Sequence, residues 1–361
     1  MIRMNSKLIA RRVRAIRREL NKKKIRFLIV TKPANVTYLT GFLGEDSWAA
    51  IAKGRVYLLT DSRYIEQAQK ECPSCKIIDR AGPMAGAVAR LVEKLKSVRT
   101  VAVEGSVSTA DFDQLKKTVK ARFRTVAGII ENVRSVKDES EIATIRSAAA
   151  ISTKALAQTL PYIKPGVTES ELAGMLDFQI RKLGARNSFE TIVAFGPNGS
   201  RPHHQPGKRK LRKKDAVLID FGAKYKGYCS DITRCFVIGG MTAFYKRVYD
   251  VVEQAQAAAI KTIRAGVKIT QVDAAARDVI KKSGLPVYGH GTGHGFGLEI
   301  HESPFLKADG KGTLKAGQVI TIEPGIYMPG KLGIRIEDDV LVTETGYKIL
   351  TRRCPHCPVL S

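Results

Sequence analysis

Two apolar, strand-like runs of this 361-residue sequence each end in a carboxylate. Val217–Ile219 leads into Asp220, and Val319–Ile322 leads into Glu323. A bare carboxylate at the end of a buried strand costs free energy unless a partner compensates its charge. Asp231 follows Asp220 across a glycine-containing turn, which predicts a hairpin. A cation shared by the two acids is therefore the expected partner.

The second half adds another acid, Glu337, in a strand-like segment, and one histidine of the same region. His290 and His294 lie in the glycine-rich run His290–Gly297, and His301 follows that run. Glycine lets the backbone approach a bound group closely. The run does not match the phosphate-binding pattern G-x-x-x-x-G-K-[ST]. Each acid alone is compatible with a helix cap or a turn, and each histidine alone with a buried core residue. Together, acids at the ends of similar strands and a nearby histidine indicate a metal site.

Four carboxylates and one imidazole suit two divalent cations, which such sites hold roughly 3.5–4 Å apart. Four negative charges at this spacing cannot all stay ionised unless cations neutralise them. The oxygen-rich donor set favours Mn²⁺, with Co²⁺ or Zn²⁺ as alternatives. A pair of this kind polarises a carbonyl and activates water, so the set predicts hydrolytic chemistry.

A short internal repeat accounts for the pairing of the acids. Ile163–Thr168 and Ile263–Lys268 are similar runs separated by 100 residues. Each is followed by a helical pattern and then by a strand that carries acids. A fixed period is typical of a duplicated unit. Two related halves, each supplying two carboxylates, predict a site at a pseudo-twofold interface.

The composition is that of a globular protein with an unusual charge. Hydrophobic residues make up 44% of the chain, and the N-terminus lacks the apolar segment of a secretory signal. No apolar run approaches the length of a membrane span, so we expect no membrane partner and a cytoplasmic location. The net charge of +27 fits a solvated basic surface or a nucleic-acid partner. The absence of a nucleic-acid-binding motif favours the solvated surface.

Four of the six cysteines form two CxxC pairs, Cys72/Cys75 and Cys354/Cys357. Paired CxxC motifs can hold a structural zinc ion. Here almost 280 residues separate the two pairs, and neither has a thioredoxin-like context. We expect ordinary reduced thiols and leave their role open.

The first third of the chain alternates helical and strand-like patterns and shows no catalytic cluster. The expected elements are a basic amphipathic helix at Ser6–Asn21, a strand at Ile25–Thr31, a loop or turn at Asn35–Phe42 and a hairpin at Trp48–Thr60 turning at Gly54. A new helix opens at Lys137–Glu141, where acidic residues suit the helix dipole. We place the domain boundary near Asn132.

These residues resemble the pita-bread metallopeptidases, and within them the aminopeptidase P/prolidase group, over nearly the whole chain. The motifs that carry the resemblance are Asp220–Gly222, Ser230–Arg234, His290–Gly297, Glu323–Gly325 and Arg335–Asp338, with Asn35–Phe42 and Thr60–Tyr64 in the N-terminal part. The resemblance implies an α+β protein. Residues 1–132 would form an α/β creatinase/prolidase N-terminal domain, and residues 133–361 a pita-bread catalytic domain with a pseudo-twofold repeat. It also implies a homodimer.

The resemblance also assigns roles to individual residues. The five metal ligands would be Asp220, Asp231, His294, Glu323 and Glu337, with Asp231 and Glu337 bridging two cations. His203, His290 and His301 match active-site histidines, Arg335 matches an arginine that braces the site, and His204 is expected to be dispensable. Arg201 departs from the small or apolar residue that the family usually has there.

The activity implied is hydrolysis of the Xaa-Pro bond at the N-terminus of peptides, by an Xaa-Pro aminopeptidase. A prolidase restricted to Xaa-Pro dipeptides is the alternative, and a nucleic-acid-associated binding protein of the same fold is the alternative of another class. A complete ligand set argues against creatinase, which is metal-free. Glu323 is expected to relay the proton, and His203 or His301 to stabilise the oxyanion.

Overall fold

The computed structural model describes residues 6–52, 54–356 and 359–360. Its contacts divide the chain into two compact units, one ending at Arg134 and the other beginning at Ser135. The domain limits 1–132 and 133–361 themselves stay a prediction. None of the described helices combines the length and the apolar character that crossing a membrane requires.

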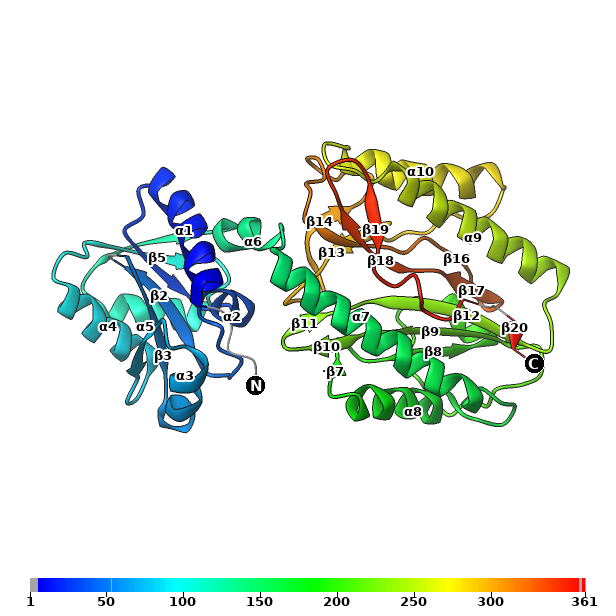
Figure 1. Ribbon diagram of the computed structural model, residues 1–361, viewed down its shortest axis with the longest axis horizontal. Helices are drawn as coiled ribbons and strands as arrows, with labels where there is room; N and C mark the ends of the chain where they lie inside the picture. The colour runs from blue at the N-terminus through cyan, green and yellow to red at the C-terminus, as the bar shows by residue number, and fades with distance from the viewer. Residues whose placement is uncertain (1–5, 53, 357–358, 361) are drawn as a thin grey trace. The chain divides into compact units, whose positions relative to one another are not determined.

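The N-terminal unit is built on a six-stranded mixed sheet of order β4-β3-β2-β1-β5-β6. The strands are β1 (Phe27–Val30), β2 (Trp48–Ala52), β3 (Arg55–Thr60), β4 (Lys76–Asp79), β5 (Thr100–Glu104) and β6 (Arg122–Val126). The β2–β3 pair is the antiparallel hairpin predicted from the sequence. α4 (Met84–Leu95) and α5 (Thr109–Thr118) cover one face of the sheet through an apolar core (Figure 1).

The remaining helices of this unit are α1 (Ser6–Lys22), α2 (Pro33–Thr40), a 3₁₀ turn at Ser62–Tyr64, α3 (Ile65–Glu71) and α6 (Ile129–Arg134). The sequence analysis expected a loop or turn at Asn35–Phe42, but the structure has the helix α2 over most of this segment. Pro33 occupies the first turn of this helix, and Gly41 ends it in the left-handed conformation with φ 84°. Proline at the start and glycine after the end are the usual helix limits. Buried Thr40 donates to Val36 O within the helix.

The second unit contains two layers of strands, each covered by a helix pair. A four-stranded sheet of order β20-β12-β9-β8 packs against α7 (Glu139–Thr159) and α8 (Glu169–Lys182). A five-stranded sheet of order β14-β13-β15-β18-β19 packs against α9 (Ala243–Thr262) and α10 (Ile269–Lys282). α8 and α10 lie on opposite sides of the strands (Figure 1).

The strands of the first layer are β8 (Ile192–Phe195), β9 (Ala216–Phe221), β12 (Ile232–Ile238) and β20 (Val359–Leu360), with the small sheet β7 (Arg186–Asn187), β10 (Ala223–Tyr225) and β11 (Tyr228–Cys229) beside it. Those of the second are β13 (Gly293–Gly295), β14 (Glu302–Leu306), β15 (Val319–Ile322), β18 (Asp338–Val342) and β19 (Tyr347–Ile349), with the hairpin β16 (Gly325–Met328) and β17 (Leu332–Arg335). The 3₁₀ turns Leu160–Tyr162 and Gly196–Ser200 complete the unit.

The internal repeat predicted from the sequence has the same backbone contacts in both halves. Gly166 N donates to Leu211 O, and Gly266 N donates to Leu314 O, both at 2.9 Å. Both glycines have positive φ, 99° and 84°, which favours glycine at each turn. These matched contacts support the duplicated unit predicted from the sequence.

Candidate metal centre

A cavity of about 740 Å³ lies in the second unit and contains all the predicted site residues. The residues that line it include the nine candidates His203, Asp220, Asp231, His290, His294, His301, Glu323, Arg335 and Glu337. They span 135 positions of the sequence, yet the two strand layers bring them to one place.

The first half of the repeat supplies two acids through the antiparallel β9–β12 pair. Asp220 lies on β9 opposite Thr233, and Asp231 immediately precedes β12. The approach of the two chains is close, because a Cβ on Gly222 would lie 1.9 Å from Ser230 O. The predicted hairpin is therefore confirmed by the antiparallel pairing of β9 with β12, and its turn lies at Lys226 and Gly227.

The second half supplies Glu337, between β17 and β18, and Glu323, directly after β15. Thr233 joins the two halves. Its backbone oxygen accepts from Glu337 N at 3.2 Å, and its hydroxyl donates to Glu337 Oε2 at 2.6 Å. Glu337 is thus held against β12, the strand that follows Asp231.

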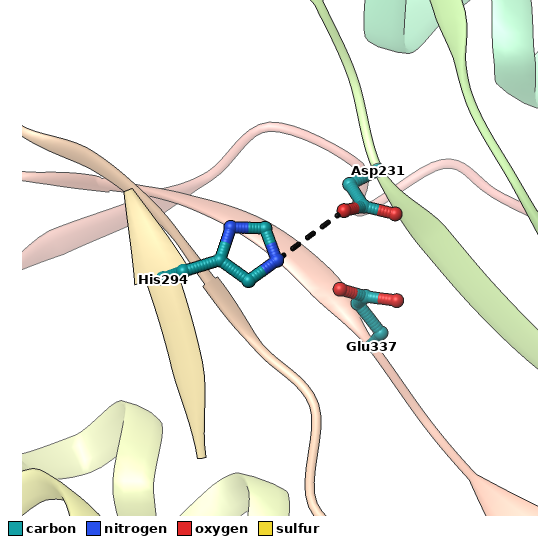
Figure 2. Close-up of side chains that lie close together, drawn as sticks. All are labelled: Asp231, His294 and Glu337. Carbon is teal, nitrogen blue, oxygen red and sulfur yellow. Dashed lines mark ion pairs between the residues drawn. The ribbon is translucent and has the colours of Figure 1, made fainter. Parts of the chain in front are cut away.

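His294 enters the cavity from β13. Its backbone N donates to Thr321 Oγ at 3.1 Å, and its Nδ1 lies 3.1 Å from Gly295 O. Nε2 is then directed at the acids, 3.6 Å from Asp231 Oδ2 and 3.4 Å from Glu323 Oε1. Figure 2 shows the imidazole pointing toward the space between Asp231 and Glu337.

Asp231, His294 and Glu337 each offer a ligand atom, and these atoms lie within 4.8 Å of one another. Among the described residues, no other group of histidine, cysteine or acidic side chains meets this geometry. Asp220 lies beside the group, and its buried Oδ1 has no hydrogen-bond partner. An unpaired buried carboxylate oxygen fits a cation ligand, because leaving it unpaired costs free energy.

Burial makes the acids of the site costly to ionise. It raises the pKa of Asp231 and Glu337 well above their ordinary values, and neighbouring carboxylates raise them further. The pKa of Glu323 rises to about 7 for the same reason. Burial lowers the pKa of His294 to about 4, which keeps the imidazole neutral. Neutral imidazole among crowded oxygen donors fits divalent cations.

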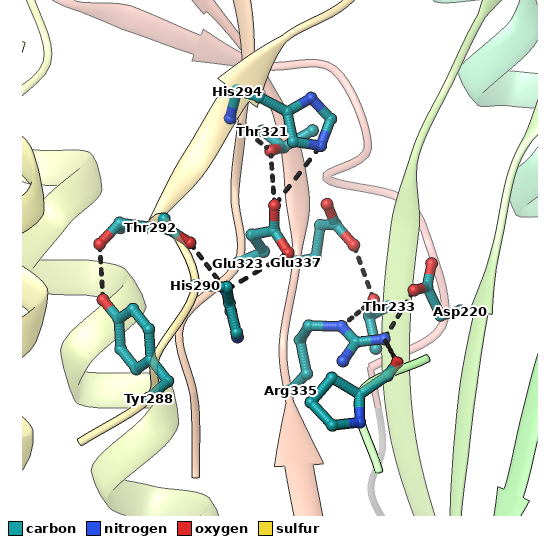
Figure 3. Close-up of polar contacts among 12 residues, drawn as sticks. Asp220, Thr233, Tyr288, His290, Thr292, His294, Thr321, Glu323, Arg335 and Glu337 are labelled. Carbon is teal, nitrogen blue, oxygen red and sulfur yellow. Dashed lines mark hydrogen bonds and ion pairs between the residues drawn. The ribbon is translucent and has the colours of Figure 1, made fainter. Parts of the chain in front are cut away.

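Arg335 braces the acids rather than facing the cavity as a free cation. Nη2 donates to Asp220 Oδ2 at 2.6 Å and Nε donates to Thr233 Oγ at 3.0 Å. Its other contacts are with Tyr327 Oη at 2.8 Å and Pro202 O at 3.3 Å. Figure 3 shows the guanidinium directed at Asp220 and Thr233.

The three candidate histidines have different surroundings. His290 is half-buried between Tyr327 Oη at 3.0 Å and Gly291 O at 2.8 Å, and burial lowers its pKa to about 4. The His301 ring packs edge-on at 4.5 Å from the His294 ring. His203 and His301 are exposed residues of the cavity wall. They are therefore accessible to a substrate.

The sequence analysis did not identify Glu169, a buried acid that binds the segment 195–207, which carries His203. Glu169 is fully buried and accepts hydrogen bonds from Phe195 N at 2.8 Å and Gly207 N at 3.0 Å. It also contacts Asn198 Nδ2 at 2.7 Å and His204 Nε2 at 2.9 Å. His204, expected to be dispensable, is thus part of a buried anchor.

Asp339 was missed in the same way. It is fully buried, and the backbone N of Asp231 donates to its carboxylate at 3.2 Å and 3.3 Å. The only signal in the sequence is that two further acids follow Glu337.

Arg201, the departure from the family pattern, is exposed, bonds to Asn198 at 2.5 Å and does not line the cavity.

None of the five described cysteines lines this cavity. The five described cysteines are free thiols. A hydrogen bond with Cys75 and burial raise the pKa of Cys72 far above its ordinary value. Cys357 lies outside the described residues, so the Cys354/Cys357 pair stays a feature of the sequence alone.

Comparison with known proteins identifies the family of both units. The model of the creatinase/prolidase N-terminal domain matches residues 12–136, and that of metallopeptidase family M24 matches residues 143–344. The uncharacterized peptidase YqhT of Bacillus subtilis is 38% identical over 327 residues, which cover 90% of this chain and 93% of that protein.

Solved structures agree with these matches. An Xaa-Pro dipeptidase from Bacillus anthracis is 35% identical, with a TM-score of 0.93 and coverage of 98% of this chain and 100% of that one. An X-Pro aminopeptidase from Thermotoga maritima is also 35% identical, with a TM-score of 0.88 and coverage of 95% and 100%. The resemblance to the aminopeptidase P/prolidase group is confirmed, and the chain belongs to metallopeptidase family M24 with a creatinase/prolidase N-terminal domain.

Proposed function

We propose that this metallopeptidase is an Xaa-Pro aminopeptidase, which removes the N-terminal residue from peptides with proline in the second position. The observation that carries the proposal is the convergence of Asp231, His294 and Glu337 within 4.8 Å in a cavity of about 740 Å³. Asp220 and Glu323 complete the ligand set. Mn²⁺ as the metal, a homodimer and a cytoplasmic location belong to the same proposal.

The two divalent cations that these five residues would hold supply Lewis acidity for the scissile carbonyl and activation of the attacking water. Glu323 takes a proton from that water and delivers it to the proline nitrogen. His203 or His301, on the accessible wall of the cavity, donates to the oxygen that becomes negative. Arg335 keeps Asp220 in place through its 2.6 Å contact.

The choice between aminopeptidase and prolidase depends on how the substrate's C-terminal end is held. A dipeptide presents the proline carboxylate inside the site, and a buried carboxylate needs a cation. Arg335 already bonds to Asp220, Thr233, Tyr327 and Pro202. This arrangement favours longer peptides, whose carboxylate stays outside.

A prolidase restricted to dipeptides is the second candidate, because the Bacillus anthracis relative is an Xaa-Pro dipeptidase. Lys307 and His203, which line the cavity, are the groups available to a dipeptide carboxylate.

Comparing kcat/KM for Xaa-Pro-Yaa tripeptides with that for the matching Xaa-Pro dipeptides separates the two activities. The aminopeptidase proposal predicts the higher value for tripeptides. Cleavage of dipeptides alone would establish the prolidase instead.

A further inference from the structure

A second cavity, of about 550 Å³, lies entirely within the N-terminal unit. Its walls come from the end of α1, the turns before β1 and β5, the end of β2, and β6. Five lining residues are cationic, and none of the described lining residues is acidic. The cations are Arg17, Lys24, Arg26, Arg99 and Arg124. The proposed peptidase reaction uses none of them.

These five cations have no acidic partner among the described residues. Other basic residues of the same unit do form ion pairs: Arg63 with Asp61 at 2.7 Å, and Lys116 with Asp113 at 2.8 Å. The unit as a whole is basic, since residues 1–134 contain 28 Lys and Arg against 12 Asp and Glu. That net +16 is more than half of the chain's +27. A concave surface lined by one sign of charge concentrates counter-ions.

Arg17 shows most directly that a partner is missing. Its Nε is buried and has no hydrogen-bond partner. The end of its side chain lies over the turn at Gly54, where an added Cβ would be 3.5 Å from Nη1. An unpaired buried donor costs free energy, which an anion in the cavity would recover.

The chemistry of the walls identifies the class of anion. Four of the five cations are arginines, whose planar guanidinium forms paired hydrogen bonds with phosphate oxygens. Single-stranded nucleic acids need exposed aromatic rings for stacking, but the one aromatic side chain among the described lining residues, Phe27, is 1% exposed. The volume is within the range of small-molecule sites. We propose that this cavity binds a small anion carrying two or more phosphate groups.

Calorimetric titration of the metal-free full chain with inorganic pyrophosphate, at physiological salt, tests the proposal. We expect one pyrophosphate per chain, bound more tightly than inorganic phosphate. Arg26→Gln combined with Arg99→Gln should weaken binding about tenfold or more. Both side chains are exposed, so the fold should survive, and Arg124→Gln alone provides a second variant of the same kind.

The matched control removes equal charge outside the cavity. Lys94→Gln combined with Lys117→Gln changes two exposed residues that do not line it, and the affinity should stay within about twofold of the wild type. Equal weakening in both double variants would show a bulk charge effect and overturn the proposal. Absence of pyrophosphate binding by the wild type would do the same. Tighter binding of a single-stranded oligonucleotide than of pyrophosphate, lost in the arginine variant, would replace the small anion with nucleic acid.

Discussion

Individual side chains of the site are held so that buried oxygens face one another. Asp339 holds the backbone of Asp231, and the side chains of Glu337 and Asp220 are held by Thr233 and Arg335. Crowding of this kind raises the free energy of the metal-free chain, because burial and neighbouring acids oppose ionisation. The free energy of metal binding must offset that cost.

Glu323→Gln tests the proton relay. The amide keeps the shape of the side chain but cannot accept a proton at neutral pH. We expect kcat to fall by about 10²–10⁴-fold, while the far-ultraviolet circular dichroism spectrum stays that of the wild type. Metal content measured on the same sample separates loss of the relay from loss of a ligand. Near-normal kcat in the metal-loaded variant would refute the assignment.

Glu169→Ala tests the anchor of the His203 loop. It removes four hydrogen bonds to a fully buried carboxylate, so the free energy of unfolding should fall by about 1–3 kcal/mol. kcat should also fall, because the 195–207 segment carries His203 into the cavity. Glu169→Gln keeps one acceptor oxygen, so the free energy of unfolding and kcat should both fall less than in Glu169→Ala.

Glu344→Ala is the control for that substitution, since Glu344 is exposed. It should leave stability and turnover unchanged. Unaltered turnover in Glu169→Ala would mean that the anchor has no bearing on His203.

The β9–β12 hairpin is the element that sets the spacing of the first two acids. Gly222 lies directly after β9 and close to the facing segment, where an added Cβ would meet Ser230 O at 1.9 Å. Gly222→Ala should therefore force the strands apart, lowering the free energy of unfolding by about 1–3 kcal/mol. Because the same shift displaces Asp220 and Asp231, metal affinity measured by titration should fall as well.

Gly174→Ala gives the matched control at another glycine. Gly174 lies in α8, is exposed, and has nothing within 4 Å of an added Cβ. Alanine should stabilise the helix by up to about 1 kcal/mol. Equal thermal stability of the two variants would contradict the steric argument.

The elements that could be predicted from the sequence are those with local signals. The apolar runs before Asp220 and Glu323, the glycine turn at Gly54 and the repeat at 163–168 were each visible in a short window. α2 was missed because Asn35–Phe42 was interpreted as a loop or turn, although Pro33 and Gly41 are the usual limits of a helix. Glu169 and Asp339 were missed because their partners lie 26 to 108 residues away. Contacts at that separation depend on the packed layers, which no local pattern specifies.

At the scale of the whole molecule, stability is coupled to metal and to pH. Burial raises the pKa of Glu323 to about 7 and those of Asp231 and Glu337 well above their ordinary values. In the metal-free chain, these three carboxyl groups therefore hold more protons in the folded state than in the unfolded state above about pH 4.5, whereas His290 and His294, whose pKa values burial lowers to about 4, hold fewer below about pH 6.5. The contribution of these carboxyl groups to the free energy of unfolding is fully present below about pH 4.5. It is lost as the pH rises through their folded-state pKa values.

Denaturant unfolding of the metal-free and Mn²⁺-loaded chains, followed across about pH 5 to 8, tests this coupling. Above about pH 6.5, where the lowered pKa values of His290 and His294 no longer contribute to the slope, the metal-free chain should become less stable as the pH rises. The loaded chain should gain stability relative to it, since cations bind the deprotonated ligands and only in the folded state. Parallel pH profiles with and without metal would contradict a shared carboxylate site.

The central claim is that the five converging residues form a metal-dependent, proline-specific peptidase site. The most direct test is hydrolysis of Xaa-Pro-Yaa and Xaa-Ala-Yaa peptides by the metal-stripped chain, before and after Mn²⁺ is restored. The account predicts no cleavage before metal addition, and afterwards cleavage only at the bond before proline. Failure to cleave either peptide with two cations bound per chain, or equal cleavage of both, would contradict it.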